Sequence, residues 1–229
     1  MRKGGFVFGF IIATLLANAS PAISDITTQF PSPNHAWTAR DYTQFYFVHL
    51  DGNQALPYLR TPAAARVFER LVDHDNIRRI IERSGPDDER IHELWMILGT
   101  LSAIRARYNL SVVIGEPLAE ELTRVQVFML YVLDETVRFS EEAMRSPSDA
   151  WKTCFLGVVQ SLAERNVYSP AQRGALATAL GDHFAGLRLL LTARDLQGVQ
   201  SQVEALATGE RDTQLRLSLQ HLLNAVARG

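Results

Sequence analysis

The chain has 229 residues, of which 47% are hydrophobic and 21% are charged. This composition excludes a disordered chain and a collagen, and the single cysteine excludes a fold held by internal disulfides. The motifs of nucleotide-binding proteins, zinc proteases and serine hydrolases do not occur, so the sequence points to no reaction. We therefore expect an ordinary globular fold, with its function to be argued from a few residues.

Residues 1–22 have the pattern of a secretory signal peptide. The basic residues Arg2 and Lys3 precede an apolar run from Phe6 to Ala17 that contains no charge. An uncleaved membrane anchor is the alternative, but the run is shorter than the roughly 20 residues that span a bilayer. Contact with a membrane is thus expected only through this segment, if it stays uncleaved. Small residues place the cleavage site after Ala19 or Ala22.

The charge balance disfavours nucleic acid as a partner. Removing residues 1–22 changes the net charge from −2 to −4, because the segment carries two basic residues and no acid. A mildly acidic protein gains little from a phosphate backbone or an anionic membrane surface. Only Lys3 and Lys152 are lysines, and this arginine bias is typical of a GC-rich bacterial genome. The sequence therefore predicts a periplasmic or secreted protein.

Five proline-marked segments predict helix starts. Proline suits the first helical position, where its missing N–H is not needed, and acidic residues follow several of these prolines. Further helices are expected over 193–207 and 211–227, as a C-terminal hairpin. The prediction for 23–229 is all-α: one irregular single-domain bundle of about seven or eight antiparallel helices. The proline spacing is irregular, which disfavours a solenoid of fixed period. The five prolines are Pro62, Pro86, Pro117, Pro147 and Pro170.

Two stretches are apolar around nearly the whole helical circumference, Leu94–Leu98 and Val125–Leu133. A helix with this pattern is buried, so these two helices are expected at the centre of the bundle. Charged residues flank both stretches closely, which excludes a membrane-spanning helix. The one-sided stripe of Trp151, Phe155, Val158 and Leu162 predicts a helix that packs against this centre.

The N-terminal segment 37–60 is rich in aromatic residues and poor in acidic ones. Within it, 44–50 is predicted as a short helix, because a single strand would have no partner. The simpler interpretation is that the aromatic side chains dock on the bundle. The alternative is a surface for a partner or an apolar ligand. Its candidate residues are Trp37, Phe45, Tyr46, Phe47 and Tyr58.

A Glu-x-x-His pair, Glu89 and His92, lies on one face of a predicted helix, as in carboxylate-bridged metal sites. If the two central helices form a hairpin that turns near Val112, Glu135 lies level with Glu89. These three residues are then candidate ligands for a divalent metal, although no particular cofactor is identified. The alternative is that they are solvated helix ends, with Arg90 and Arg138 pairing with the acids.

For the other reactive residues, the sequence favours structural roles. Cys154 lies on an apolar helix face and is expected to be a small buried side chain; an intermolecular disulfide or a reactive thiol remains open. The dipeptide Asp182–His183 can orient an imidazole, but no serine nucleophile accompanies it. Arginines and acids alternate from Arg66 to Arg83 on one predicted helix, which indicates a salt-bridged surface rather than an anion site.

The leading hypothesis is an exported, non-enzymatic helical protein that binds another envelope protein or an apolar ligand. The alternative is a metal-binding helical protein or metalloenzyme that uses Glu89, His92 and Glu135. A third possibility is a structural subunit of an envelope assembly, held through the C-terminal hairpin.

Overall fold

The computed structural model describes residues 30–47, 56–142 and 149–228, and the predicted signal peptide lies outside these ranges. Their regular structure is entirely helical, with no strand, which confirms the all-α prediction. The helices are α1 (Ala39–Tyr46), α2 (Pro62–Leu71), α3 (His74–Glu82), α4 (Asp87–Val113), α5 (Ala119–Glu142), α6 (Asp149–Ser161), α7 (Pro170–Leu187), α8 (Ala193–Gly209) and α9 (Thr213–Arg228), with a 3-10 turn, η3 (Arg188–Leu190), after α7.

The proline-marked helix starts match the observed ones closely. Pro62 and Pro170 occupy the first positions of α2 and α7. Pro86 is the N-cap of α4, and α5 begins two residues after Pro117. Pro147 lies outside the described residues. Ser169 completes a capping box at α7, with its hydroxyl accepting a hydrogen bond from the Gln172 backbone N–H.

The region from Arg66 to Arg83, expected on one helix, forms the two helices α2 and α3. Asp73 separates them, because its carboxylate accepts the backbone N–H of Asp75 at 2.9 Å and caps α3. The Arg70 guanidinium donates to the same Asp73 carboxylate at 2.6 Å. An aspartate that binds the backbone locally thus interrupts an otherwise continuous helical pattern.

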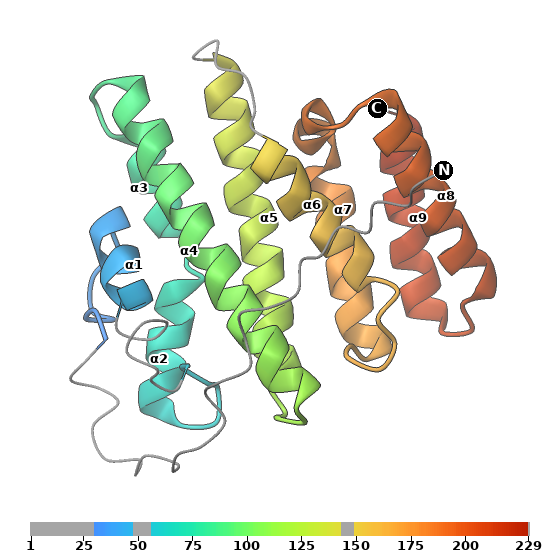
Figure 1. The fold of residues 1–229 in the computed structure, drawn as a ribbon, viewed down its shortest axis with the longest axis horizontal. Coiled ribbons are helices and arrows are strands. Elements are labelled where there is room, and N and C mark those ends of the chain that lie inside the picture. The colour runs from blue at the N-terminus through green and yellow to red at the C-terminus, as the bar shows by residue number, and fades with distance from the viewer. Residues whose placement is uncertain (1–29, 48–55, 143–148, 229) are drawn as a thin grey trace, which may run out of the picture.

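The helices from α4 onward form a stack of three hairpins, α4–α5, α6–α7 and α8–α9 (Figure 1). Helices α4, α6 and α8 touch in one layer: Ser102 Oγ lies 3.0 Å from Cys154 Sγ, and Gln202 donates to the Val159 carbonyl at 3.2 Å. Helices α5, α7 and α9 form the second layer, in which α7 contacts both of the others.

Neighbouring helices of the second layer, which are not consecutive in the chain, run in the same direction. The consecutive helices α4 and α5 run in opposite directions, because Arg90 near the start of α4 covers Phe139 near the end of α5. Between α5 and α7, and between α7 and α9, by contrast, residues further along one helix contact residues further along the other. They are Gln126–Tyr168, Asp134–His183, Thr178–Ser218 and Asp182–His221.

Helix α5 is central, as predicted, whereas α4 is buried on one side only. In α5, Val125 and Leu133 are almost fully buried. In α4, Leu94 is buried but Trp95 is 49% exposed and Met96 is 40% exposed. Helix α4 packs against α1, α3 and α5, and Trp95 and Met96 lie on the side that these helices leave uncovered.

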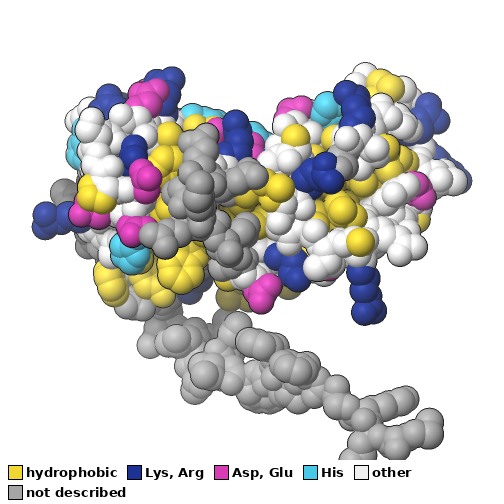
Figure 2. Space-filling model, turned by 90° about the horizontal axis from the view of Figure 1, so that it is seen from above, with side chains coloured by type: hydrophobic (Ala, Val, Ile, Leu, Met, Phe, Trp, Pro, Cys, Tyr) yellow, Lys and Arg dark blue, Asp and Glu magenta, His cyan; other side chains and the backbone are white. Residues whose placement is uncertain are grey.

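The molecule is hollowed on one side, between the end with α1–α3 and the end with α8 and α9 (Figure 2). Histidine side chains lie on both flanks of this hollow. We call it the hollow face; its floor and walls are the sides of α5, α7 and α9 that point away from α4 and α6. Within the described ranges, no helix is both long and apolar enough to cross a membrane.

Candidate functional site

The three predicted metal ligands do not converge. Glu89 and His92 are exposed near the start of α4, and Glu135 accepts a hydrogen bond from Arg138 at 3.0 Å. In the part of the chain that the structure describes, no three His, Cys, Asp or Glu side chains are arranged to hold a metal ion. The pairing of Arg138 with acids matches the solvated-helix-end interpretation, while Arg90 pairs with Asp87 at 2.5 Å.

The register of the α4–α5 hairpin explains this separation. Arg90, expected level with Asp134, covers the Phe139 ring at 4.7 Å, five residues further along α5. Helix α4 continues to Val113, and the turn passes through Gly115, whose φ of +97° favours glycine. The hairpin therefore turns later than Val112, and Glu89 is not level with Glu135.

The structure divides the aromatic candidates between core and surface. Trp37 is 1% exposed and Phe45 is fully buried, with their ring centroids 5.6 Å apart. Both are core residues and present no surface to a partner. Tyr46 and Tyr58 are half-buried, and Phe47 is 56% exposed. Among the described residues of the segment, most aromatic side chains thus pack on the bundle, which is the simpler of the two interpretations.

A polar cluster on the hollow face is the best-formed candidate site, and we call it the Asp134 cluster: His74, Tyr131, Asp134, Arg138 and His183. The Asp134 side chain is 4% exposed. It accepts two hydrogen bonds from Arg138, at 3.1 and 2.8 Å, and lies 2.8 Å from His183 Nδ1. The bond to Asp134 raises the pKa of Arg138, so the buried carboxylate has a permanent positive partner.

The second half of the cluster is a row of rings. The centroid of Tyr131 lies 4.2 Å from that of His74 and 6.1 Å from that of His183. Burial, and then the nearby Glu135 charge, raise the pKa of Tyr131, so its hydroxyl stays protonated. The row joins α3, α5 and α7 across the hollow face.

The chemistry available to His183 follows from its partner. An ionised carboxylate only accepts hydrogen bonds, so Nδ1 carries the proton that Asp134 binds, and Nε2 of the neutral ring is an acceptor. This pairing orients an imidazole as a hydrogen-bonding group. The one cysteine, Cys154, is half-buried and its thiol contacts Ser102 and Met129 instead. Asp182, adjacent to His183 in sequence, pairs with His221 at 2.8 Å.

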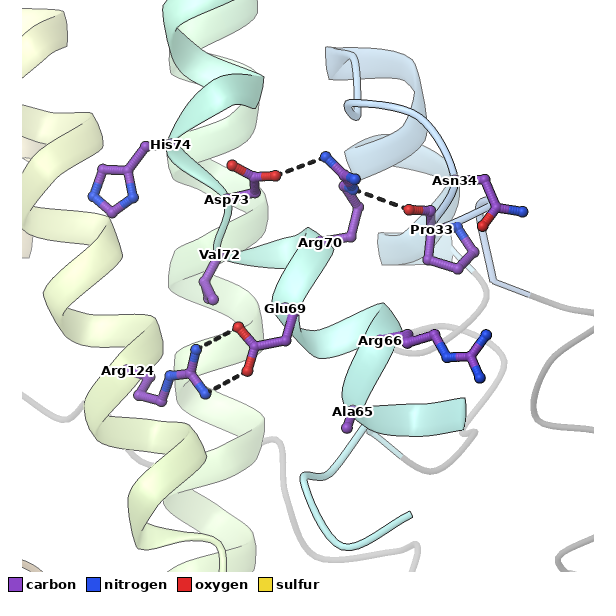
Figure 3. Close-up of a pocket in the computed structure, with 10 residues that line it drawn as sticks. All are labelled: Pro33, Asn34, Ala65, Arg66, Glu69, Arg70, Val72, Asp73, His74 and Arg124. Atoms are coloured by element: carbon purple, nitrogen blue, oxygen red, sulfur yellow. Dashed lines mark hydrogen bonds and ion pairs between the residues drawn. The ribbon is translucent and has the colours of Figure 1, made fainter. Parts of the chain in front are cut away.

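A pocket of about 630 Å³ lies at the α2 end of the same face (Figure 3). Figure 3 has α5 on the left and the N-terminal residues on the right, the reverse of Figure 1, so it looks at the side that carries the hollow. The lining includes Arg66 and Arg70 of α2 and Arg124 of α5. His74 also lines the pocket, and it is therefore shared with the Asp134 cluster.

The His74 ring is expected to make folding sensitive to pH. Burial, partly opposed by the Asp73 charge, lowers the pKa of His74 below its usual 6.5. A histidine whose pKa is lower in the folded state contributes its full stability above the unfolded pKa. This contribution is lost as the pH falls from the unfolded pKa through the folded pKa. Between about pH 7.5 and about pH 5.5, His74→Gln should therefore lose less stability than the wild type.

Urea unfolding at both pH values measures this difference, with His92→Gln as the matched control. Both histidines are largely exposed, but His74 packs its ring against Phe128 and Tyr131. Glu69, whose pKa is lowered by Arg124, matters only near or below pH 4.5 and does not interfere. An equal decline for the wild type and His74→Gln would contradict the expected role of this ring.

Sequence reasoning missed the Asp134–His183 pair because its members lie 49 residues apart. The only local signal was the dipeptide Asp182–His183, which suggested Asp182, rather than Asp134, as the carboxylate that orients the imidazole. Adjacent residues of a helix point about 100° apart, so the two side chains meet different neighbours.

Comparisons of this chain with protein-family models, with curated proteins and with solved structures find no match. Its function is therefore inferred from the hollow face, the Asp134 cluster and the pocket themselves.

Proposed function

We propose that this chain is an exported, non-enzymatic helical protein that binds another protein of the cell envelope across the hollow face. The observation that carries the proposal is the hollow itself, which the space-filling view shows in profile (Figure 2). Stacked helical hairpins create extended concave surfaces of this kind, and such surfaces commonly bind other proteins.

The lining of the hollow face supports a protein partner more than an apolar ligand. Arg138 is 53% exposed, and Asp182 and His221 are also exposed, so both signs of charge are present. Hydrophobic side chains also show at the edge of the hollow (Figure 2). Mixed polar and apolar groups of this kind resemble the rim and core of a protein interface.

Export rests on the pattern of residues 1–22, a basic start followed by an apolar run and small residues. The non-enzymatic role is supported by the way the reactive side chains are used. His183 is held by Asp134, and the Cys154 thiol faces Ser102 and Met129. Each of these groups has a structural partner within the fold.

An arginine on the floor of the hollow tests the proposal. Helix α7 packs against α5, α6 and α9, so its exposed residue Ala185 lies on the remaining side, which is that of the hollow. Ala205 is exposed on α8 in the other layer. Ala185→Arg should weaken partner binding about tenfold or more, because a long charged side chain fills the concave surface. Ala205→Arg adds the same side chain outside the hollow and should bind like the wild type.

The full-length wild type is first expressed in its own host and cross-linked in intact cells, which identifies its partner by mass spectrometry. Binding constants of the purified partner are then measured for the wild type and both variants. The N-terminus of the recovered chain shows whether export has removed the leader after Ala19 or Ala22. Equal binding by all three proteins excludes the hollow face, and a chain retained in the cytoplasm excludes an envelope role.

A further inference from the structure

The pocket at the α2 end of the hollow face carries more positive than negative charge. Its lining contains the three arginines Arg66, Arg70 and Arg124 and the two carboxylates of Glu69 and Asp73 (Figure 3). Its volume of about 630 Å³ is within the range of roughly 300–1,000 Å³ that is usual for small-ligand sites.

Both carboxylates already have cationic partners. Glu69 accepts two hydrogen bonds from Arg124, at 2.8 and 2.7 Å, and this pairing lowers the pKa of Glu69. Asp73 accepts from Arg70 at 2.6 Å. Neither carboxylate therefore balances the remaining arginine of the pocket.

That remaining arginine is Arg66. None of the described residues forms a hydrogen bond or ion pair with its guanidinium, although the sequence predicts a surface of paired charges here. Arg66 and Arg70 lie four residues apart on α2, so their like charges repel each other on one helix face. An anion placed between these side chains relieves the repulsion and accepts several charge-assisted hydrogen bonds.

We propose that this pocket binds the carboxylate or phosphate group of an anionic ligand, with Arg66 as the principal contact. Arg70 is fixed beside the site, because its Nε donates to the Pro33 carbonyl at 3.1 Å. Asn34 lies on the same side of the pocket as Arg66 and adds a side-chain amide donor, while the Glu69–Arg124 pair forms the opposite side (Figure 3).

The anionic group can belong to a small metabolite or to an acidic side chain of a protein. Inorganic phosphate, glutarate and a short glutamate-rich peptide distinguish these sources by isothermal titration calorimetry. The purified protein is titrated with each probe in a buffer that contains no other oxyanion.

Arg66→Gln should weaken binding of the preferred probe roughly tenfold or more, because a hydrogen-bonded charge is removed. The matched control is Arg79→Gln, which removes another exposed arginine, from α3 and outside the pocket lining. Thermal unfolding of both variants verifies that they are folded.

Saturable binding that depends on Arg66 and not on Arg79 supports the site, whichever probe gives it. Binding that survives Arg66→Gln, or that falls equally in both variants, overturns the proposal. It is also overturned if none of the three probes binds more tightly than about 10 mM. The site does not require the hollow-face function, because these titrations use neither Ala185 nor a partner protein.

Discussion

Asn76→Ala is expected to lower the free energy of unfolding by about 2–4 kcal/mol, although the change removes only a few atoms. Asn76 is 1% exposed at the point where the N-terminal segment meets α2 and α3. Its Oδ1 accepts the Trp37 backbone N–H at 2.7 Å, and its Nδ2 donates to the Tyr42 hydroxyl at 2.9 Å and to the Arg70 carbonyl at 2.7 Å.

The size of this effect follows from the groups that Asn76 satisfies. Alanine leaves the buried Trp37 N–H without an acceptor, and an unsatisfied buried donor costs about 1–3 kcal/mol. The Tyr42 hydroxyl keeps one bond, to the Leu71 carbonyl at 2.6 Å. Burial raises the pKa of Tyr42, so this hydroxyl remains a donor throughout the usual pH range.

Urea unfolding followed by tryptophan fluorescence measures the loss. Asn109→Ala is the control, because Asn109 is exposed on α4, and it should change stability by no more than about 0.5 kcal/mol. Tyr42→Phe should cost about 1 kcal/mol, and the double variant less than the sum of the two, because the residues share a hydrogen bond. A cost for Asn76→Ala that equals the Asn109→Ala cost would show that the network does not hold the segment.

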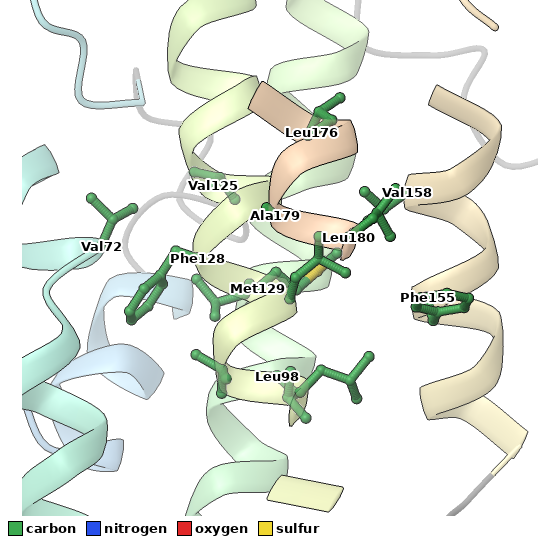
Figure 4. Close-up of a cluster of buried hydrophobic side chains, with 14 of the residues drawn as sticks. Val72, Leu98, Val125, Phe128, Met129, Phe155, Val158, Leu176, Ala179 and Leu180 are labelled. Atoms are coloured by element: carbon green, nitrogen blue, oxygen red, sulfur yellow. The ribbon is translucent and has the colours of Figure 1, made fainter. Parts of the chain in front are cut away.

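The elements of this fold could be predicted from the sequence wherever their signals are local. Proline and acidic caps located most helix starts, and the continuous apolar run of α5 identified the centre of the core. Figure 4 shows Val125, Phe128 and Met129 of this helix between Val72 and the side chains of α6. The arrangement of the helices depends on contacts between residues that are 39 to 52 positions apart, and such contacts produce no periodic pattern in the sequence.

The candidate site was harder to predict because none of its residues belongs to a recognisable sequence motif. Glu89 and His92 have a recognisable spacing, yet a later turn in the hairpin leaves them apart from Glu135. Asp134 and His183 carry no motif, and only the parallel packing of α5 on α7 brings them together. Arg66 looks like any other member of a charged helix until the break at Asp73 opens a pocket beside it.

The pocket and the Asp134 cluster share one residue, which gives the hollow face a continuous polar lining. His74 lines the pocket on one side and packs its ring against Tyr131 on the other. A partner seated in the hollow would therefore meet Arg138 and His183 in the middle and the arginines of α2 at the end. A partner protein with an acidic segment in the pocket would satisfy both proposals, the hollow-face interaction and the anion site.

Gly186→Ala is expected to destabilise the fold by about 1–3 kcal/mol, against the usual preference of helices for alanine over glycine. A Cβ on Gly186 would overlap Asp134 Oδ1 and lie 3.2 Å from Asp134 Cγ. The carboxylate cannot move aside freely, because His183 and Arg138 both hold it. The substitution therefore either breaks these bonds or pushes α7 away from α5.

Gly198→Ala provides the contrast, since Gly198 lies in α8 and an added Cβ meets nothing within 4 Å. This change should stabilise the protein by about 0.5–1 kcal/mol, because only helix propensity changes. Thermal or urea unfolding of the two variants therefore gives effects of opposite sign. In the Gly186→Ala background, Asp134→Ala should cost less than in the wild type, because the overlap disappears with the carboxylate. If both glycine variants were equally stabilising, the contact between α5 and α7 at Asp134 would have to be looser than the structure shows.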